Sequence, residues 1–311
     1  MWLRRFTKVV AAATLFLIFA GAMVTSTGSG LAVPDWPNTY GTFMFSFPMS
    51  KWVGGIFYEH GHRLIASTVG FLVVIQAIWL QLREPKKIVR TLGWLSLLAV
   101  CVQGALGGIT VLLLLPKSIS ISHAALAEIF FCINVSIAFF TSRWFQSLQG
   151  VEKGDAPVGM AWSLTALVYL QILAGAVLRH LGAGLAIPDF PLSFGRVIPR
   201  FTSPEVVAAF THRAGGFVVA TMVIIMAVRL LRYEKQHPLR GLGSLLLVVV
   251  ALQVLLGGWV IWSGKQPHIT SLHVMTGAFT LALSIVLTLS SRTLRWKKSG
   301  RTRTSLVEVT A

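Results

Sequence analysis

The sequence predicts an all-α polytopic membrane protein with eight transmembrane helices, and three observations support that fold class. Of the 311 residues, 55% are hydrophobic and only 12% are charged, whereas soluble domains carry roughly 25% charged residues. The chain contains eight mostly apolar segments that are long enough to cross a bilayer, which takes about 20 residues. A sequence repeat then divides these segments into two sets of four. An ordinary soluble domain is excluded by this composition.

The spans are separated by short connectors, except for two longer ones, residues 28–57 and 181–206, which are rich in Gly, Pro and aromatic residues. The first apolar run comes after Arg4, Arg5 and Lys8 and could be mistaken for a signal peptide. Its length favours a retained helix, and so does the recurrence of the adjoining loop sequence later in the chain. The predicted spans are approximately 9–27, 58–82, 91–115, 119–141, 158–180, 207–231, 241–263 and 268–290.

The positive charges predict the orientation of the chain. The formal net charge of +17 could suggest nucleic-acid binding, but 19 of the 27 Lys and Arg residues fall on one side of the predicted spans. Lys and Arg accumulate on the cytoplasmic side of membrane proteins. Both termini are therefore expected in the cytoplasm and both long loops outside, most simply in a bacterial plasma membrane. The lipid bilayer is the expected partner, and nucleic acid is not.

The two halves of the chain resemble each other. Residues 28–41 read GSGLAVPDWPNTYG and residues 182–195 read GAGLAIPDFPLSFG, with eight of fourteen positions identical at an offset of 154. Farther along, His and Gly positions recur at an offset of 150. Because each half contains an even number of spans, the repeats share one orientation. Two parallel four-helix bundles are expected, residues 1–150 and residues 151–311, the second ending in a basic cytoplasmic tail.

Four of the eight His residues recur in this repeat, His62 with His212 and His123 with His273. Each is expected within about the first two turns of a span that starts at the outer face, so each half places two imidazoles at one depth. A single intramembrane His is commonly a packing residue, but repeated pairs favour ligands. Zinc or copper would normally need further ligands, and no Cys or carboxylate recurs beside both pairs. A porphyrin needs only two axial ligands from the protein, so one haem per half is predicted.

The polar residues around the pairs are not fully repeated. Arg63 and Arg213 come directly after a His in both halves and could hold haem propionates or reach the membrane interface. Glu59, three residues before His62, has Ala209 as its counterpart, which suggests that the first half performs chemistry and the second holds a permanent cofactor. Glu128 is a weaker candidate. Arg179-His180 are also not repeated, since their counterparts in the first half are Thr25-Ser26. The remaining histidines, His60, His237 and His268, are not expected to be ligands.

The ordered set of these residues resembles the haem A synthase family over approximately residues 9–290. The resemblance implies oxidation of the C8 methyl of haem O to a formyl group, giving haem A for terminal oxidases. It implies that His212 and His273 ligate a haem b, with Arg213 and Arg179 also contacting this cofactor. It implies that His62, His123 and Arg63 flank the substrate haem O, with Glu59 as the essential carboxylate. A haem O-producing farnesyltransferase and an oxidase assembly factor are the protein partners that such an activity suggests.

One feature departs from the family pattern. Some bacterial members carry a Cys pair in the first outer loop, whereas Cys101 and Cys132 here lie in apolar spans. The chain therefore resembles the cysteine-free branch. Two other classes stay open on the sequence, a di-haem quinol-linked electron-transfer cytochrome and a haem transporter. The cytochrome accounts for the four His residues but not for Glu59 opposite Ala209, and the transporter does not require ligands at matched depth.

Overall fold

The computed structural model describes residues 1–150, 154, 156–235 and 237–294, and these residues are helical apart from their loops and two isolated β-bridges. Eight helices are long and apolar enough to cross a membrane, which confirms the predicted number of spans. They are α1 (Trp2–Ser26), α2 (Gly55–Arg83), α3 (Lys87–Leu112), α4 (Lys117–Phe140), α6 (Val158–His180), α7 (Pro204–Leu231), α8 (Pro238–Trp262) and α9 (Pro267–Leu294).

A short helix, α5 (Arg143–Gln149), lies in the segment that the sequence predicted as a plain connector. The Ser142 side chain caps it by accepting a hydrogen bond of 3.0 Å from the Phe145 backbone N–H, as N-terminal Ser residues commonly do. Three single 3₁₀ turns, η1 (Met44–Ser46), η2 (Met49–Lys51) and η3 (Ala183–Leu185), lie in the two long loops.

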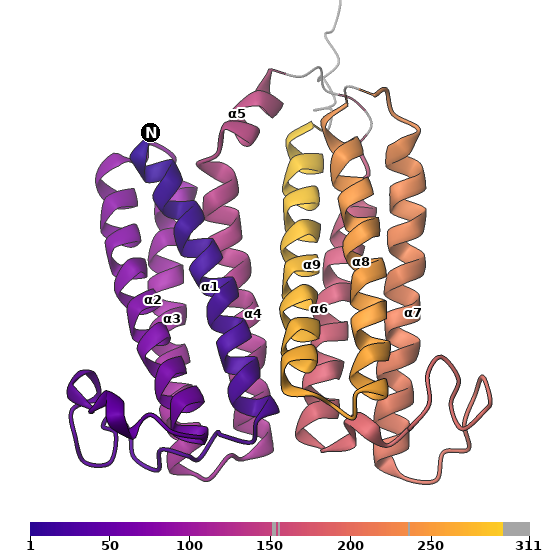
Figure 1. Cartoon of the computed structure of the whole chain (residues 1–311). Helices are drawn as coiled ribbons and strands as arrows, with labels where there is room; N and C mark the ends of the chain where they lie inside the picture. Colours follow the sequence, from indigo (N-terminus) through magenta and orange to yellow (C-terminus); the bar gives the residue numbers. More distant parts are fainter. Residues whose placement is uncertain (151–153, 155, 236, 295–311) are drawn as a thin grey trace, which may run out of the picture.

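The long helices form two groups of four that stand side by side (Figure 1). Helices α1 to α4 pack against one another in one group, and α6 to α9 in the other. The N-terminus and the end of α9 lie at one end of the molecule, and both long loops lie at the opposite end (Figure 1). The assignment of the first end to the cytoplasm and the domain division at residue 150 stay predictions. The predicted basic tail, residues 295–311, lies outside the described residues.

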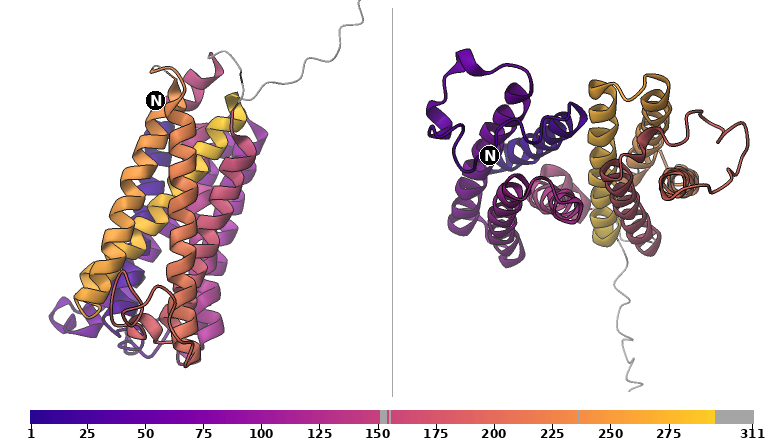
Figure 2. Two further views of the ribbon diagram at one scale, coloured as in Figure 1. Left: turned by 90° about the vertical axis from the view of Figure 1, so that its right-hand side faces the viewer. Right: turned by 90° about the horizontal axis from the view of Figure 1, so that it is seen from below.

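The two groups meet through α1 and α4 on one side and α6 and α9 on the other, as the view along the helices shows (Figure 2). Small side chains such as Ala278 and Ala282 of α9 are buried there against Phe131 and Val135 of α4. Small residues let transmembrane helices approach closely, because between helices in lipid the attraction comes from packing and not from water exclusion. Among the spans α9 is the most enclosed, with 56% of its most apolar stretch buried.

The helix surfaces on the outside of the two groups expose large apolar side chains. Phe71 on α2 is 65% exposed and Phe217 on α7 is 77% exposed. Such large exposed apolar side chains are unfavourable in water but suit contact with lipid acyl chains. The pattern agrees with a multi-pass membrane protein.

Candidate functional site

The four repeated histidines lie near the loop end of their helices. They are the seventh to ninth residues of α2, α4, α7 and α9, which is slightly deeper than predicted because these helices begin one to three residues earlier than the hydropathy suggested. All four rings are partly buried. Within each group the two imidazoles lie close enough to interact electrostatically, His62 with His123 and His212 with His273. The predicted pairing is therefore present in space.

The second pair has a spacing that suits a metal between the rings. The ring centroids of His212 and His273 are 6.3 Å apart and the ring planes meet at 79°. Two metal–imidazole bonds of about 2.0–2.1 Å, plus about 1.1 Å from each ligating nitrogen to its ring centre, add to about 6.3 Å. The centroid spacing therefore matches that of two imidazoles on one metal ion. No cluster of three or more His, Cys, Asp or Glu residues occurs in the described parts of the chain, so a cofactor that brings its own equatorial ligands fits better than a bare ion.

Each histidine ring packs against a glycine on a neighbouring helix, where a larger side chain would collide with it. A Cβ built at Gly175 of α6 would lie 2.9 Å from Cε1 of His212, and one at Gly257 of α8 would lie 3.1 Å from Cε1 of His273. The first group shows the same arrangement, with distances of 3.0 and 3.4 Å. These glycines make room for the rings; the pairs are Gly21 with His62, Gly107 with His123, Gly175 with His212 and Gly257 with His273.

The two pairs differ in how the other ring nitrogen is held. Nδ1 of His212 lies 3.1 Å from Nε2 of Gln171, and Nδ1 of His273 lies 3.2 Å from the backbone oxygen of Gln253. Nδ1 of His62 and Nδ1 of His123 are buried and have no hydrogen-bond partner. A metal-bound His usually donates its free N–H to a partner that fixes the ring. In the second pair, His273 has such an acceptor in the Gln253 backbone oxygen, whereas the Gln171 amide nitrogen beside His212 is a donor.

Arg63 anchors the first long loop to α2 through hydrogen bonds. Its Nη1 donates to the backbone oxygens of Asp35 and Asn38 at 2.7 and 3.0 Å, and its Nη2 donates to the backbone oxygen of Val33 at 2.9 Å and to Glu59 Oε1 at 2.6 Å. A guanidinium has five N–H donors, and these contacts leave only Nε–H without a hydrogen bond. The predicted contact between Arg63 and a haem propionate stays a prediction, with little of the side chain left to make it.

Arg213 clasps the second loop in the same way. Its Nη1 donates to the backbone oxygens of Asp189 and Leu192 at 2.7 and 2.9 Å, and its Nη2 donates to that of Ile187 at 2.8 Å. The guanidinium also lies 5.9 Å from the centre of the Phe190 ring. Its contact with a haem b propionate likewise stays a prediction. In both halves the Arg next to the His fixes the loop above the site.

An aspartate closes the turn in each loop, as the sequence predicted. The carboxylate of Asp35 accepts hydrogen bonds of 2.8 Å from the backbone N–H groups of Tyr40 and Gly41, and Asp189 makes the corresponding bonds at 2.7 and 2.8 Å. Partial burial alone would raise the pKa of Asp35, but these N–H donors outweigh it and lower that pKa below its usual value. The same kind of backbone donor lowers the pKa of Asp189. Both carboxylates are thereby kept ionised.

Glu59 takes part with Arg63 in the contacts that hold the first long loop on α2. The residue is only 3% exposed; Oε2 accepts a hydrogen bond of 2.8 Å from the Val33 N–H, and Oε1 forms the ion pair with Arg63. Its counterpart Ala209 is 4% exposed and packs with Ile187. The asymmetry between halves is therefore present in space. The buried carboxylate balances the charge of Arg63, a balance that Arg213 does not receive from Ala209.

Arg179 reaches from one group of helices to the other. Its Nη2 on α6 donates to the backbone oxygen of Ala22 at 2.6 Å and to the Ser26 hydroxyl at 2.7 Å, both on α1. Ser271 on α9 also donates to the Ser26 hydroxyl, at 3.2 Å. Arg179 thus joins the two halves, while its predicted contact with a cofactor stays a prediction. Its acceptor Ala22 adjoins Gly21, which packs against the His62 ring.

Two other buried groups lie outside the pairs. Glu128 of α4 is 4% exposed and its Oε2 has no hydrogen-bond partner, while its counterpart at the 150-residue offset is Ala278, which is fully buried. His60 is a packing residue. Its Nδ1 lies 3.1 Å from the Thr39 hydroxyl and its ring packs edge-on against Trp52. The exclusion of His60 from the ligand set agrees with these contacts.

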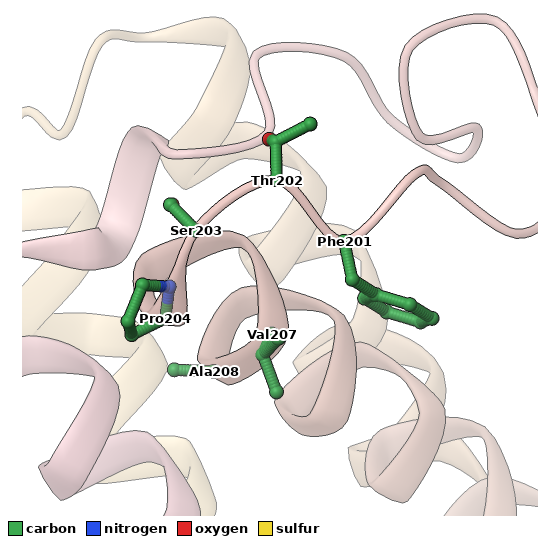
Figure 3. A pocket seen from close by; sticks show the side chains of 6 residues that line it. All are labelled: Phe201, Thr202, Ser203, Pro204, Val207 and Ala208. Atoms are coloured by element: carbon green, nitrogen blue, oxygen red, sulfur yellow. The ribbon is translucent and has the colours of Figure 1, made fainter.

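A surface pocket lies away from the histidines. It has a volume of about 600 Å³ and is open, and it is formed where the second loop enters α7 (Figure 3). The Phe201 ring and the Val207 side chain border it, and Ser203 caps the helix by accepting a hydrogen bond from Val206 N–H (Figure 3). It contains none of the predicted site residues. The interior histidine pairs are therefore the stronger candidate site.

Sequence reasoning missed three residues of this site. Gly21 and Gly175 are related by the 154-residue offset, so the repeat could have identified them as matching positions of the two halves, and Gln171 lies in a span as an unrepeated polar residue. The Gly107-Gly108 and Gly257-Gly258 pairs recur at the 150-residue offset. Their second members, Gly108 and Gly258, make room for the rings of the loop residues Trp36 and Phe190, which is a packing role.

The fold and the site together define a class: an eight-span helical membrane protein in which each half encloses a pair of histidines backed by glycines. Residues 4–285 match the family described as Cytochrome oxidase assembly protein (COX15-CtaA). Since that match covers most of the chain, the protein belongs to this family.

Curated relatives are similar over most of their length. The chain is 28% identical over 263 residues to a protein of Symbiobacterium thermophilum named Heme A synthase, covering 82% of this chain and 84% of that one. It is 27% identical over 302 residues to the Heme A synthase of Halalkalibacterium halodurans, covering 93% and 97%. A Heme A synthase of Bacillus cereus is 26% identical over 285 residues, covering 87% and 88%.

Proposed function

We propose that this protein is a haem A synthase, a membrane enzyme that oxidises the C8 methyl group of haem O to a formyl group. The observation that carries the proposal is the pair of histidine sites, alike in geometry but unlike in their polar partners, in a chain of this family. Two equal sites would suit electron transfer alone. One site whose histidine rings have polar contacts at Nδ1, beside another whose rings lack them, suits an enzyme with one permanent cofactor and one haem that enters and leaves.

His212 and His273 are proposed as the axial ligands of a resident haem b. The ring spacing of 6.3 Å and the glycines behind both rings support the fit. A bound haem b would supply one-electron redox chemistry at this position. The chain's own contribution is to hold both imidazoles in place through their Nδ1 atoms and to cover the site with the loop that Arg213 clasps.

His62 and His123 are proposed to flank the substrate haem O. Their Nδ1 atoms have no partners, so the rings are less constrained, which suits a group that must be released as product. Glu59 is proposed as the essential carboxylate of this half. Its contacts support a positioning role, because it holds Arg63 and the Val33 N–H and so keeps the first loop closed over the histidines.

The surroundings of the reaction depend on the membrane location. We propose that the chain lies in a bacterial plasma membrane with the histidines near the outer face, since the clasped loops and the histidines share one end of the helices. Haem O would arrive from a haem O-producing farnesyltransferase, and haem A would leave toward an oxidase assembly factor. Both haems are amphipathic, so the lipid bilayer is their natural route.

Co-expression with a haem O-producing enzyme tests the proposal. Membranes that contain the protein should yield haem A on extraction and mass analysis. Recovery of only haem B and haem O from folded protein would refute the synthase activity. Two tightly held haem B groups in equal amounts would instead identify a di-haem electron-transfer cytochrome.

Two variants separate the roles of the halves. Glu59→Ala should keep the resident haem but stop haem A formation, while His212→Ala should remove the low-spin haem spectrum. Haem A yield equal to wild type in Glu59→Ala would remove Glu59 from the reaction. An unchanged low-spin spectrum in His212→Ala would remove His212 from the ligand set.

A further inference from the structure

The two long loops expose large apolar side chains outside the membrane spans. Met49 of the first loop is 79% exposed and Val197 of the second is 80% exposed, and these are the two most exposed large apolar side chains among the described residues. Contact between such groups and water is unfavourable, so clusters of them mark surfaces that bind something else. The other exposed apolar side chains are Phe43, Phe45 and Val53 in the first loop and Phe194 and Ile198 in the second.

Both loops lie beside the helix ends and not beyond them. They project sideways from the two groups, away from each other, and reach back to the level of the neighbouring helix turns (Figure 1, Figure 2). The helix that follows the first loop, α2, has 29 residues and is therefore about 43 Å long. A bilayer with its headgroup layers is about 40–45 Å thick. The first turns of α2, and the loop at their level, therefore lie in a headgroup layer.

The charges of the exposed loop segments have one sign. Residues 43–57 and 192–203 contain three cationic residues, Lys51, Arg196 and Arg200, and no Asp or Glu. All three cationic residues are exposed. Lys and Arg near a membrane surface are attracted to anionic lipid headgroups. Aromatic and aliphatic side chains interspersed with cations are therefore complementary to the headgroup layer in both polarity and charge.

The opposite side of each segment is fixed to the protein. In the first loop the buried Phe47 ring lies 5.1 Å from the His60 ring, and the Trp52 ring lies 4.7 Å from it, measured between ring centres. In the second loop the ring centre of Phe201 lies 5.5 Å from that of Phe210, which is the counterpart of His60 at the 150-residue offset. A ring at one matched position of each half thus supports the loop, and the outward side chains are held facing away from the protein.

We propose that the two long loops are membrane-interface anchors, which insert their exposed apolar side chains among the acyl chains at headgroup level and place Lys51, Arg196 and Arg200 against lipid phosphates. The inference does not depend on the proposed haem chemistry. It holds for either orientation of the chain, because both leaflets carry phosphates. The bilayer then holds each loop from outside, while Arg63 and Arg213 hold it from the helix side.

Spin labels on the full-length protein in nanodiscs of phosphatidylcholine and phosphatidylglycerol test the proposal. In a background with Cys101→Ala and Cys132→Ala, labels at Phe43→Cys and Val197→Cys should collide more often with oxygen, which concentrates in the bilayer, than with a water-soluble nickel complex. Asn38→Cys is the matched control, because Asn38 is an exposed polar residue of the first loop whose backbone oxygen is held by Arg63. Its label should show the reverse preference.

Nickel access at Phe43→Cys and Val197→Cys as high as at Asn38→Cys would overturn the proposal, because the segments would then lie in water. Low access of both reagents would also overturn it, since another protein or a second copy of this chain would then cover the loops.

The cations are tested separately at the Val197→Cys label. Nanodiscs that contain phosphatidylglycerol should protect this label from the nickel complex better than phosphatidylcholine alone. Arg196→Gln combined with Arg200→Gln should abolish that difference, because the two charges that favour the anionic lipid are gone. A difference that persists in the double variant would overturn the assignment of these cations to lipid phosphates.

Discussion

Gly175→Ala directly tests the glycine that backs the His212 ring. The added Cβ would lie 2.9 Å from Cε1 of His212, whereas ordinary van der Waals contact begins at 3.4 Å. The difference means that the ring or α6 must move by about 0.5 Å, which exceeds the tolerance of about 0.2 Å for metal–ligand distances. The variant should therefore lose most of the haem held by His212 and His273, although its helix should be intrinsically more stable by about 1 kcal/mol.

The assay is the haem content per purified protein together with the low-spin absorption spectrum. Gly159→Ala is the control on the same helix, since nothing lies within 4 Å of a Cβ built there. It should keep full haem content. Gly107→Ala, with a contact of 3.4 Å to His123, should be the mildest of the four histidine-backing variants. Full haem content and an unchanged spectrum in Gly175→Ala would refute the reasoning that this glycine accommodates a ligand ring.

Three further predictions concern the loops and the contact between halves. Gly108→Ala places a Cβ 2.6 Å from the Trp36 ring, so limited proteolysis of the first long loop should be faster than in wild type. The pKa values of Asp35 and Asp189 are lowered in the folded protein, so these carboxylates stabilise the loops fully above the unfolded pKa of about 3.9. This stabilisation is lost as the pH falls through the lower folded pKa, and backbone hydrogen exchange in both loops should become faster over that pH range. Hydrogen exchange in the loops that does not respond to acid would contradict this. Arg179→Leu should lower the free energy of unfolding by about 2 kcal/mol, the scale of hydrogen bonds from charged groups, measured by denaturant titration in detergent.

The number of spans and their order could be predicted because a bilayer demands them. Each span must satisfy its backbone hydrogen bonds within a helix and present apolar side chains to lipid, so hydropathy and length suffice. The pairing of the histidines could be predicted for a related reason. Within one half, His212 and His273 both lie near the start of a span that begins at the outer face, so equal depth follows from topology, and the repeat extends the same argument to His62 and His123.

The exact beginnings of the helices and the short helix α5 could not be predicted. Helix ends depend on capping contacts, such as that between Ser142 and the Phe145 N–H, and not on hydropathy. The partners of Arg63 were also missed. A sequence shows that a cation comes directly after a ligand candidate, but only the folded loop shows that three of its carbonyl oxygens lie within reach.

By itself the sequence determined the eight membrane spans, the repeat and the residues in which the two halves differ, because hydropathy and offset are properties of the order of residues alone. Only the tertiary structure decided what those differences do. Glu59 balances Arg63 within a loop clasp, and Gln171 reaches the His212 ring through space left by Gly215. The Gln171 contact joins residues that lie 41 positions apart, and it depends on how two helices face each other to within a fraction of an ångström. Hydropathy carries no information at that scale.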